Sequence, residues 1–226
     1  MDCRFKSHCK KILNGKCNMD DFCMRRYKLD FLFDNSLIPK NRIDKESLFV
    51  DEDGTDIDIF ERLQNIQSSI SDFVKNGGNL YLCSNSPGNG KTSWAIRLAQ
   101  YFIYCNWIEF SLKPKVLFIS VPKFLLELKA NIGHESSYIA FINENINDVD
   151  LVIWDDIATK SATEFEHEHL LSLIDSRIYD GKSNIFTSNV LPDNLSELLG
   201  GRLASRIVNE SECLEFNGKD KRGVNR

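Results

Sequence analysis

The chain has 226 residues, of which 42% are hydrophobic, and it carries 28 Lys and Arg against 33 Asp and Glu, a formal net charge of −5. A chain of this length can bury a substantial core in one or two domains, and it contains no apolar run approaching the roughly 18 residues that a membrane-spanning helix needs, so a transmembrane protein is excluded. The net negative charge argues against a protein that coats nucleic acid over its whole surface.

The N-terminal segment differs from the rest of the chain in charge and in cysteine content. Residues 1–28 hold eight Lys and Arg and three Asp, so this segment carries +5 and the remainder −10. No apolar stretch follows the charges of MDCRFKSHCKK, so we expect no secretory signal and a cytoplasmic protein with reduced thiols. These shifts predict a separate module over residues 1–35 and a polar, acidic linker over residues 36–54.

Four of the seven cysteines lie within this module, at Cys3, Cys9, Cys17 and Cys23. Four thiolates within 21 residues can close a tetrahedral Zn²⁺ site. A stretch this short cannot build a hydrophobic core unaided. A bound metal would therefore be needed to hold its shape. We predict a zinc site with these four ligands, although the spacing is wider than usual. His8 is the alternative to Cys9, and free thiols on a helical arm are the alternative to a metal site.

From residue 55 onwards, helical and strand patterns alternate. Thr55 and Asp56 are predicted to cap a helix that runs to about Lys75, where Gly77 and Gly78 stop it. Short apolar runs predict strands over residues 79–84, 115–120, 150–156, 183–189 and 212–216. The intervening segments predict helices over residues 93–107, 122–132, 136–147, 163–179 and 193–209. Apolar strands separated by helices indicate an α/β fold with a doubly wound, mostly parallel sheet.

A glycine-rich loop lies between the first predicted strand and the next helix. Its sequence, NSPGNGKT over residues 85–92, follows the P-loop pattern except that Asn85 replaces the first glycine. Asn tolerates left-handed backbone angles, so the turn can survive this change. In such loops backbone N–H groups and a lysine bind nucleotide phosphates, and the next hydroxyl binds Mg²⁺. The predicted ATP-binding residues are Pro87, Gly88, Asn89, Gly90, Lys91, Thr92 and Ser93, together with Asp155.

A second motif ends the third predicted strand. Leu151–Asp156 is four apolar residues followed by two acids, the form of a Walker B strand. Asp155 is predicted to hold Mg²⁺ together with Thr92, and Asp156 to polarise the attacking water. Asp156 stands where many such ATPases have Glu, so we expect slow or assembly-dependent hydrolysis.

The order of these motifs resembles that of AAA+ ATPases, and more closely the bacterial and phage replicative helicase loaders of the DnaC/DnaI kind and the related IstB-like proteins. The resemblance covers roughly residues 55–226. The segments that carry it are SPGNGKTS, LVIWDDIA, IFTSN, LLGGRLASRI and EFNGKDKRG. It implies a P-loop NTPase core without a C-terminal lid and a small N-terminal module that grips the helicase.

The same resemblance implies roles for single residues. Asn189 matches the sensor 1 residue, and Arg222 matches the sensor 2 arginine. Arg206 matches the arginine finger that reaches a neighbour's nucleotide, with Arg202 as the alternative. These three, with Asp156, complete the predicted catalytic set.

A further set concerns DNA. Lys123, Phe124 and Lys129 follow the second predicted strand, where the loader family contacts single-stranded DNA, although Phe124 is equally a candidate core residue.

The sequence therefore predicts an ATPase that uses ATP, Mg²⁺ and Zn²⁺ and delivers a replicative hexameric helicase onto single-stranded DNA. Its expected partners are that helicase, single-stranded DNA and copies of itself joined through ATP interfaces, with no membrane. A nucleotide-gated adaptor with little hydrolysis, which recruits a transposase or another DNA-processing protein, is the first alternative. A generic P-loop kinase is the second, but no substrate-binding lid is evident.

Overall fold

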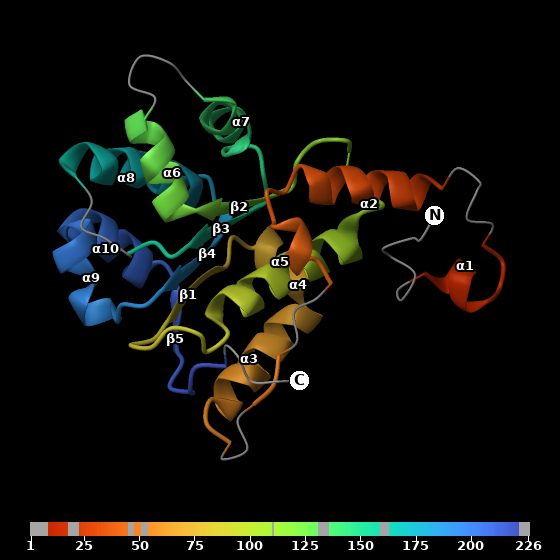
Figure 1. The fold of residues 1–226 in the computed structure, drawn as a ribbon, viewed down its shortest axis with the longest axis horizontal. Coiled ribbons are helices and arrows are strands. Elements are labelled where there is room, and N and C mark those ends of the chain that lie inside the picture. Colours follow the sequence, from red (N-terminus) through yellow and green to blue (C-terminus); the bar gives the residue numbers. More distant parts are fainter. Residues whose placement is uncertain are drawn as a thin grey trace.

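A computed structural model describes residues 9–17, 23–44, 48–50, 54–109, 111–130, 136–158 and 163–221. Its centre is a five-stranded sheet with the order β2-β3-β4-β1-β5, in which every neighbouring pair is parallel. The strands are β1 (Asn79–Cys83), β2 (Val116–Ser120), β3 (Leu151–Asp155), β4 (Ser183–Ser188) and β5 (Glu212–Glu215). The predicted α/β fold with a parallel sheet is confirmed, and all five predicted strands are present (Figure 1).

Helices cover both faces of this sheet (Figure 1). One face packs against α2 (Met24–Asp34), α3 (Ile57–Ser68), α4 (Ile70–Lys75) and α5 (Lys91–Asn106). The other packs against α6 (Val121–Ala130), α7 (Ser137–Asn145), α8 (Glu164–Tyr179), α9 (Pro192–Leu199) and α10 (Gly201–Asn209). Alternate strand residues enter opposite cores, since Leu80 and Leu82 join the first cluster while Tyr81 and Cys83 join the second. Strands buried on both faces explain why they appear in the sequence as unbroken apolar runs.

Two predicted helices are each divided in two. The helix expected over residues 55–75 breaks at Ser69 between α3 and α4, and the helix expected over residues 193–209 breaks at Gly200, whose φ of 75° interrupts the turn between α9 and α10. Gly201 opens α10, so the break sets the direction of the helix that carries Arg206.

The boundary of the core lies earlier in the chain than the sequence predicts. Two short elements precede α3, namely α1 (Lys10–Leu13) and a 3-10 turn, η2 (Lys40–Arg42). Leu29, Leu32 and Phe33 of α2 share one buried cluster with the α5 side of the sheet, and so do Ile38 and Ile43 of the expected linker. The linker prediction over residues 36–54 is therefore wrong for its first half, because a few apolar residues anchor a segment that is polar on average.

One charged side chain lies inside the second core. Arg177 of α8 is fully buried and donates hydrogen bonds to the carbonyl oxygens of Ile146, Val149 and Ser183 and to Oδ1 of Asn184. Burial lowers the pKa of Arg177 to about 9. The guanidinium still carries its charge at neutral pH, and it ties α8 to the segments that flank β3 and β4.

No helix in the described ranges is both long and apolar enough to cross a membrane.

Candidate functional site

The glycine-rich loop joins the carboxyl end of β1 to the start of α5. Gly88 and Gly90 adopt positive φ angles of 79° and 103°, and Gly90 directly precedes the 16-residue α5. Asn85 is not among the described residues with positive φ, so the turn needs no left-handed residue at that position. The glycines that remain supply the left-handed angles, and the loop leads into a helix N-terminus that favours anionic ligands.

The ammonium group of Lys91 is held inside this loop. Lys91 is only 5% exposed, and its Nζ donates to Ser84 Oγ at 2.6 Å, Asn89 Oδ1 at 2.8 Å and the carbonyl oxygen of Ser86 at 3.1 Å. Ser84 is the residue immediately after β1, and no sequence motif marks it. These contacts fix a buried cation at the centre of the loop.

Asn89 provides the test of whether the loop fits a phosphate chain. Its side chain is 1% exposed, and its Nδ2 has no hydrogen-bond partner within the described part of the chain. A buried donor without a partner is unfavourable unless a ligand accepts from it. An unpaired amide donor beside the Lys91 ammonium fits an anionic ligand with several acceptor oxygens, such as a nucleotide triphosphate.

The carboxyl end of β3 lies at the same edge of the sheet. Asp155 is buried and accepts a hydrogen bond from Thr187 Oγ1 at 2.8 Å, and the same Thr187 oxygen accepts from the backbone N–H of Asp156 at 3.0 Å. Asp156 has a left-handed φ of 56°, which Asp adopts more readily than most residues. Thr187 of β4 thus orients both predicted acids, a role that no sequence motif marks.

Opposing effects act on the Asp155 carboxyl. Burial raises its pKa, while hydrogen bonds from Thr187 and Thr92 lower it and the charge of Asp156 raises it further. The contact with Thr92 joins the two residues predicted to share Mg²⁺. A buried carboxylate next to a hydroxyl is a hard oxygen donor set of the kind that Mg²⁺ takes, so the residues present fit this metal.

Asn189 directly follows β4. In the sheet, β4 lies between β3 and β1. The carboxyl end of β4 therefore lies between Asp155 at the end of β3 and the glycine-rich loop that follows β1. The structure therefore brings the three predicted strand-end motifs together at one edge, as parallel strands require.

A C-terminal segment, residues 216–221, crosses this edge. The backbone N–H groups of Asn217 and Gly218 donate to the Asp56 carboxylate at 2.7 and 2.8 Å, and the N–H of Lys221 donates to the carbonyl oxygen of Gly88 at 2.9 Å. Asp56 was predicted to cap α3 but makes no such side-chain contact, and its carboxylate binds this segment instead. Arg222 lies outside the described residues, but the residue before it is bonded to the glycine-rich loop.

Two further charged groups near the loop were missed by the sequence analysis. Asp220 lies so close to Gly88 that a Cβ at Gly88 would sit 1.7 Å from its Oδ1. Arg42 of η2 donates from Nη2 to Ser93 Oγ at 3.0 Å, and its charge lowers the pKa of Asp155. Both residues come from segments remote in sequence, so only the fold shows that they belong to the site.

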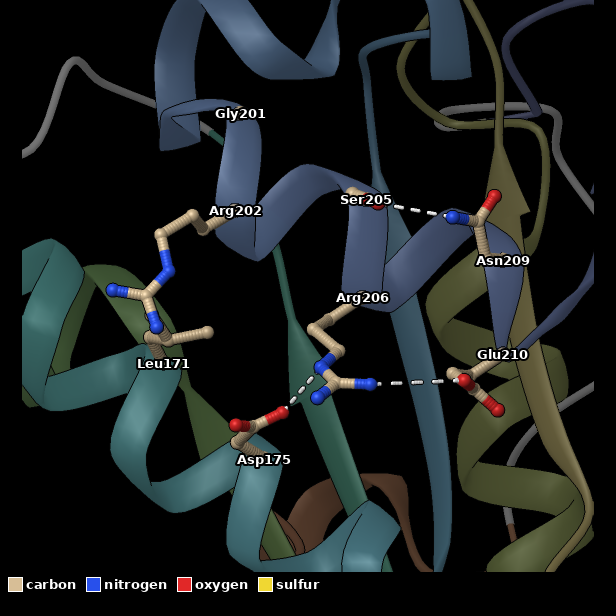
Figure 2. A pocket seen from close by; sticks show the side chains of 8 residues that line it. All are labelled: Leu171, Asp175, Gly201, Arg202, Ser205, Arg206, Asn209 and Glu210. Atoms are coloured by element: carbon tan, nitrogen blue, oxygen red, sulfur yellow. Dashed lines mark hydrogen bonds and ion pairs between the residues drawn. The ribbon is translucent and has the colours of Figure 1, made fainter.

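Arg202 and Arg206 are exposed residues of α10, which packs on the opposite face of the sheet from α5. Figure 2 shows Arg206 between Asp175 of α8 and Glu210, with Arg202 one turn earlier. Arg206 Nε lies 2.5 Å from Asp175 Oδ1, and its Nη1 lies 3.9 Å from Glu210 Oε1. The prediction that Arg206 acts on a neighbouring subunit is compatible with this exposed position but is not tested by it.

The three residues predicted to touch DNA differ in exposure. Phe124 is fully buried among α6, α7 and α8, so its ring is a core residue and cannot stack on a base. Lys123 Nζ lies 4.3 Å from the centre of the Tyr138 ring, and Lys129 Nζ lies 3.1 Å from Glu166 Oε1. DNA contact by the two lysines stays a prediction, while base stacking by Phe124 is wrong.

The cysteine module is described only in part. Cys9, Cys17 and Cys23 are free and partly exposed, while Cys3 and His8 lie outside the described residues. Among the described residues, no group of three or more His, Cys, Asp or Glu is arranged to hold a metal. The four-cysteine site therefore stays a prediction.

Comparisons with known proteins agree with this geometry. Residues 38–226 match the family described as IstB-like ATP binding protein. The replicative helicase loader DnaC of Buchnera aphidicola subsp. Baizongia pistaciae (strain Bp) is 26% identical over 139 residues, which are 61% of this chain and 54% of that protein. The chain thus spans about half the length of this relative.

Solved structures show the same fold. The crystal structure of DnaI aligns with a TM-score of 0.64 and 19% identity over 80% of this chain and 95% of that one. The replication initiator DnaA bound to AMPPCP and single-stranded DNA aligns with a TM-score of 0.58 and 18% identity over 81% of this chain and 51% of that one. At these identities the likeness establishes the AAA+ P-loop NTPase architecture.

Proposed function

The chain belongs to the family of IstB-like ATP binding proteins, and from that premise we propose that it is an ATP-dependent loader, which delivers a replicative hexameric helicase onto single-stranded DNA. The observation that carries the proposal is the unpaired, buried amide of Asn89 beside the Lys91 ammonium, at the same edge of the sheet as Asp155. Similarity to a DnaC loader and to DnaI supports the helicase as partner, and the DnaA structure with single-stranded DNA supports the DNA.

Different residues of this edge bind ATP and cleave it. Lys91 neutralises the phosphate oxygens, and Asn89 donates to them. Thr92 and Asp155 would hold Mg²⁺, which would supply positive charge to the phosphates. Asp156, held in place by Thr187, orients the attacking water. Its side chain is one methylene shorter than Glu, so we expect slow turnover by a free subunit.

ATP acts in this proposal as an assembly switch. With ATP bound, the phosphates of one subunit attract Arg206 of the next, and the contact joins subunits head to tail. Cleavage removes the γ-phosphate and with it the attraction, which releases the assembly from the loaded helicase. The sensor residues Asn189 and Arg222 would report the state of the γ-phosphate to the rest of the core.

A nucleotide-gated adaptor that recruits a transposase is the second candidate function. The substitution of Asp156 for Glu favours it, because weak hydrolysis suits a protein that only changes partners with ATP. Strong stimulation of ATP turnover by DNA together with a helicase would exclude it, whereas a loader requires that stimulation.

Loading itself is the first test of the proposal. Wild-type protein with Mg²⁺-ATP is expected to place a hexameric replicative helicase on circular single-stranded DNA, which gel filtration detects as helicase that elutes with the circle. Lys91→Ala protein serves as the control and should leave the helicase unbound. Equal loading with and without ATP, or with the Lys91→Ala protein, would contradict the loader role.

We further propose that the N-terminal module binds one Zn²⁺ through Cys3, Cys9, Cys17 and Cys23 and docks on the helicase. The segment ahead of α2 is too short to build a core of its own and needs a metal to hold its shape. The charge of +5 over residues 1–28 suits an acidic partner surface. Among the described residues, the hydrogen bonds at the ATP-binding edge involve none from this module.

Cys17→Ser is therefore expected to lose both zinc and helicase binding while ATP binding persists. The matched control is Cys105→Ser, which removes an exposed thiol outside the module. Elemental analysis of the purified proteins measures the metal. Zinc well below one equivalent in wild-type protein prepared without chelators would show that these cysteines are ordinary thiols.

A further inference from the structure

An ion pair holds the predicted arginine finger within its own subunit. Arg206 Nε lies 2.5 Å from Asp175 Oδ1, while the contact from Arg206 Nη1 to Glu210 Oε1 is 3.9 Å, beyond hydrogen-bonding distance. Arg202, one turn earlier on the same helix, has no ion-pair partner in the described part of the chain (Figure 2). Of the two candidate fingers, only Arg206 is restrained by a close carboxylate.

The ion pair between Asp175 and Arg206 lies in a solvent-open groove between α8 and α10 and separates two pockets of that groove. The pockets measure about 400 and 340 Å³, and Asp175 and Arg206 line both of them. The Arg206 side chain is 49% exposed and that of Asp175 is 39% exposed. A phosphate from another subunit can therefore reach the guanidinium without any movement of the core, provided that the guanidinium leaves Asp175.

We propose that Asp175 is a positioning residue that holds Arg206 in free subunits and competes with the neighbouring subunit's ATP phosphates for its guanidinium. The inference rests on the proposed action of Arg206 in trans. Assembly would then require an exchange of one anion for another at the same guanidinium.

The exposure of the pair makes this exchange easy. Water screens ion pairs at such positions, so they are weak and reversible. A triphosphate carries more charge than one carboxylate and offers several acceptor oxygens, so it wins the guanidinium once the subunits meet. Asp175 therefore raises the protein concentration that assembly requires, but it does not prevent assembly at high concentration.

The test is to neutralise Asp175 while keeping its shape. Asp175→Asn retains an oxygen that accepts from Arg206 Nε but removes the charge. We expect the protein concentration at which ATP turnover reaches half its maximum to fall roughly fivefold in Asp175→Asn relative to wild type. Local damage to α8 cannot produce this result, because damage raises that concentration or lowers the maximum.

Two controls make the result specific. Glu197→Gln removes one negative charge from the exposed face of α9 and should leave the midpoint unchanged. In an Arg206→Ala background, the small residual ATP turnover should not change when Asp175→Asn is added, because the group that Asp175 restrains is gone.

An unchanged or higher midpoint in Asp175→Asn would overturn the hold of Asp175 on Arg206 alone. So would residual turnover that rises when Asp175→Asn is added to Arg206→Ala. Wild-type turnover that does not depend on protein concentration would overturn the trans action of Arg206 and the hold with it.

Discussion

Replacing Lys91 with alanine is expected to weaken Mg²⁺-ATP binding at least tenfold, a loss of about 1.4 kcal/mol or more. The substitution removes the cation at the centre of the loop, which is 5% exposed and bonded to Ser84, Ser86 and Asn89. It also leaves two buried oxygens, Ser84 Oγ and Asn89 Oδ1, without this donor. Both losses act on the phosphate-binding side of the loop, so affinity should fall without a change in the fold of the sheet.

Isothermal calorimetry with ATP and Mg²⁺ measures this loss. Lys75→Ala, at the exposed end of α4, is the matched control and should bind ATP like the wild type. Thermal unfolding without nucleotide would show that both variants are folded. Equal affinity in Lys91→Ala and wild type would mean that the nucleotide site has been assigned to the wrong loop.

Replacing Arg206 with alanine is expected to leave ATP binding unchanged and to lower assembly-dependent turnover about 100-fold or more, since arginine fingers contribute on the order of 10³–10⁵ in rate. Arg206 lies on α10, which covers the opposite face of the sheet from α5, and it forms ion pairs with Asp175 and Glu210. It therefore adds nothing to the nucleotide site of its own chain. Arg202→Ala is the matched control, and a loss of turnover there instead would move the finger to Arg202.

The sequence predicts the sheet and the nucleotide loop well for a physical reason. The four strands β1 to β4 are buried on both faces, so they must be apolar runs. A loop that turns several N–H groups towards phosphates needs glycine at particular positions. These constraints act within a few consecutive residues, so a local sequence pattern such as Gly88-Asn89-Gly90-Lys91 is enough to predict the loop.

The residues that the sequence did not reveal act through contacts between remote segments. Thr187 orients Asp155 and Asp156 from a neighbouring strand, and a threonine in a strand is ordinarily just a strand residue. Asp56 has the position of a helix cap, but it binds backbone groups 161 and 162 residues later. Only the fold brings such partners together, so no local pattern distinguishes them.

At two places the polarity of a segment predicted exposure for residues that the fold buries. The expected linker is polar overall, yet Ile38 and Ile43 bury themselves in the core and carry Arg42 to the edge of the nucleotide site. Phe124 directly follows Lys123, and a cation beside an aromatic ring suits DNA, yet this ring is fully enclosed. Single buried side chains, rather than the composition of a segment, decide where these residues lie.

The central claim is that the ATP of one subunit is cleaved with Arg206 of the next, and mixing two inactive variants tests it most directly. Lys91→Ala protein has an intact finger, and Arg206→Ala protein has an intact loop. Because head-to-tail contacts pair the loop of one subunit with the finger of its neighbour, about a quarter of the interfaces in a random equal mixture regain both. ATP turnover measured across mixing ratios should therefore rise well above either parent and peak near equal amounts, whereas a mixture as inactive as its parents at every ratio would contradict the claim.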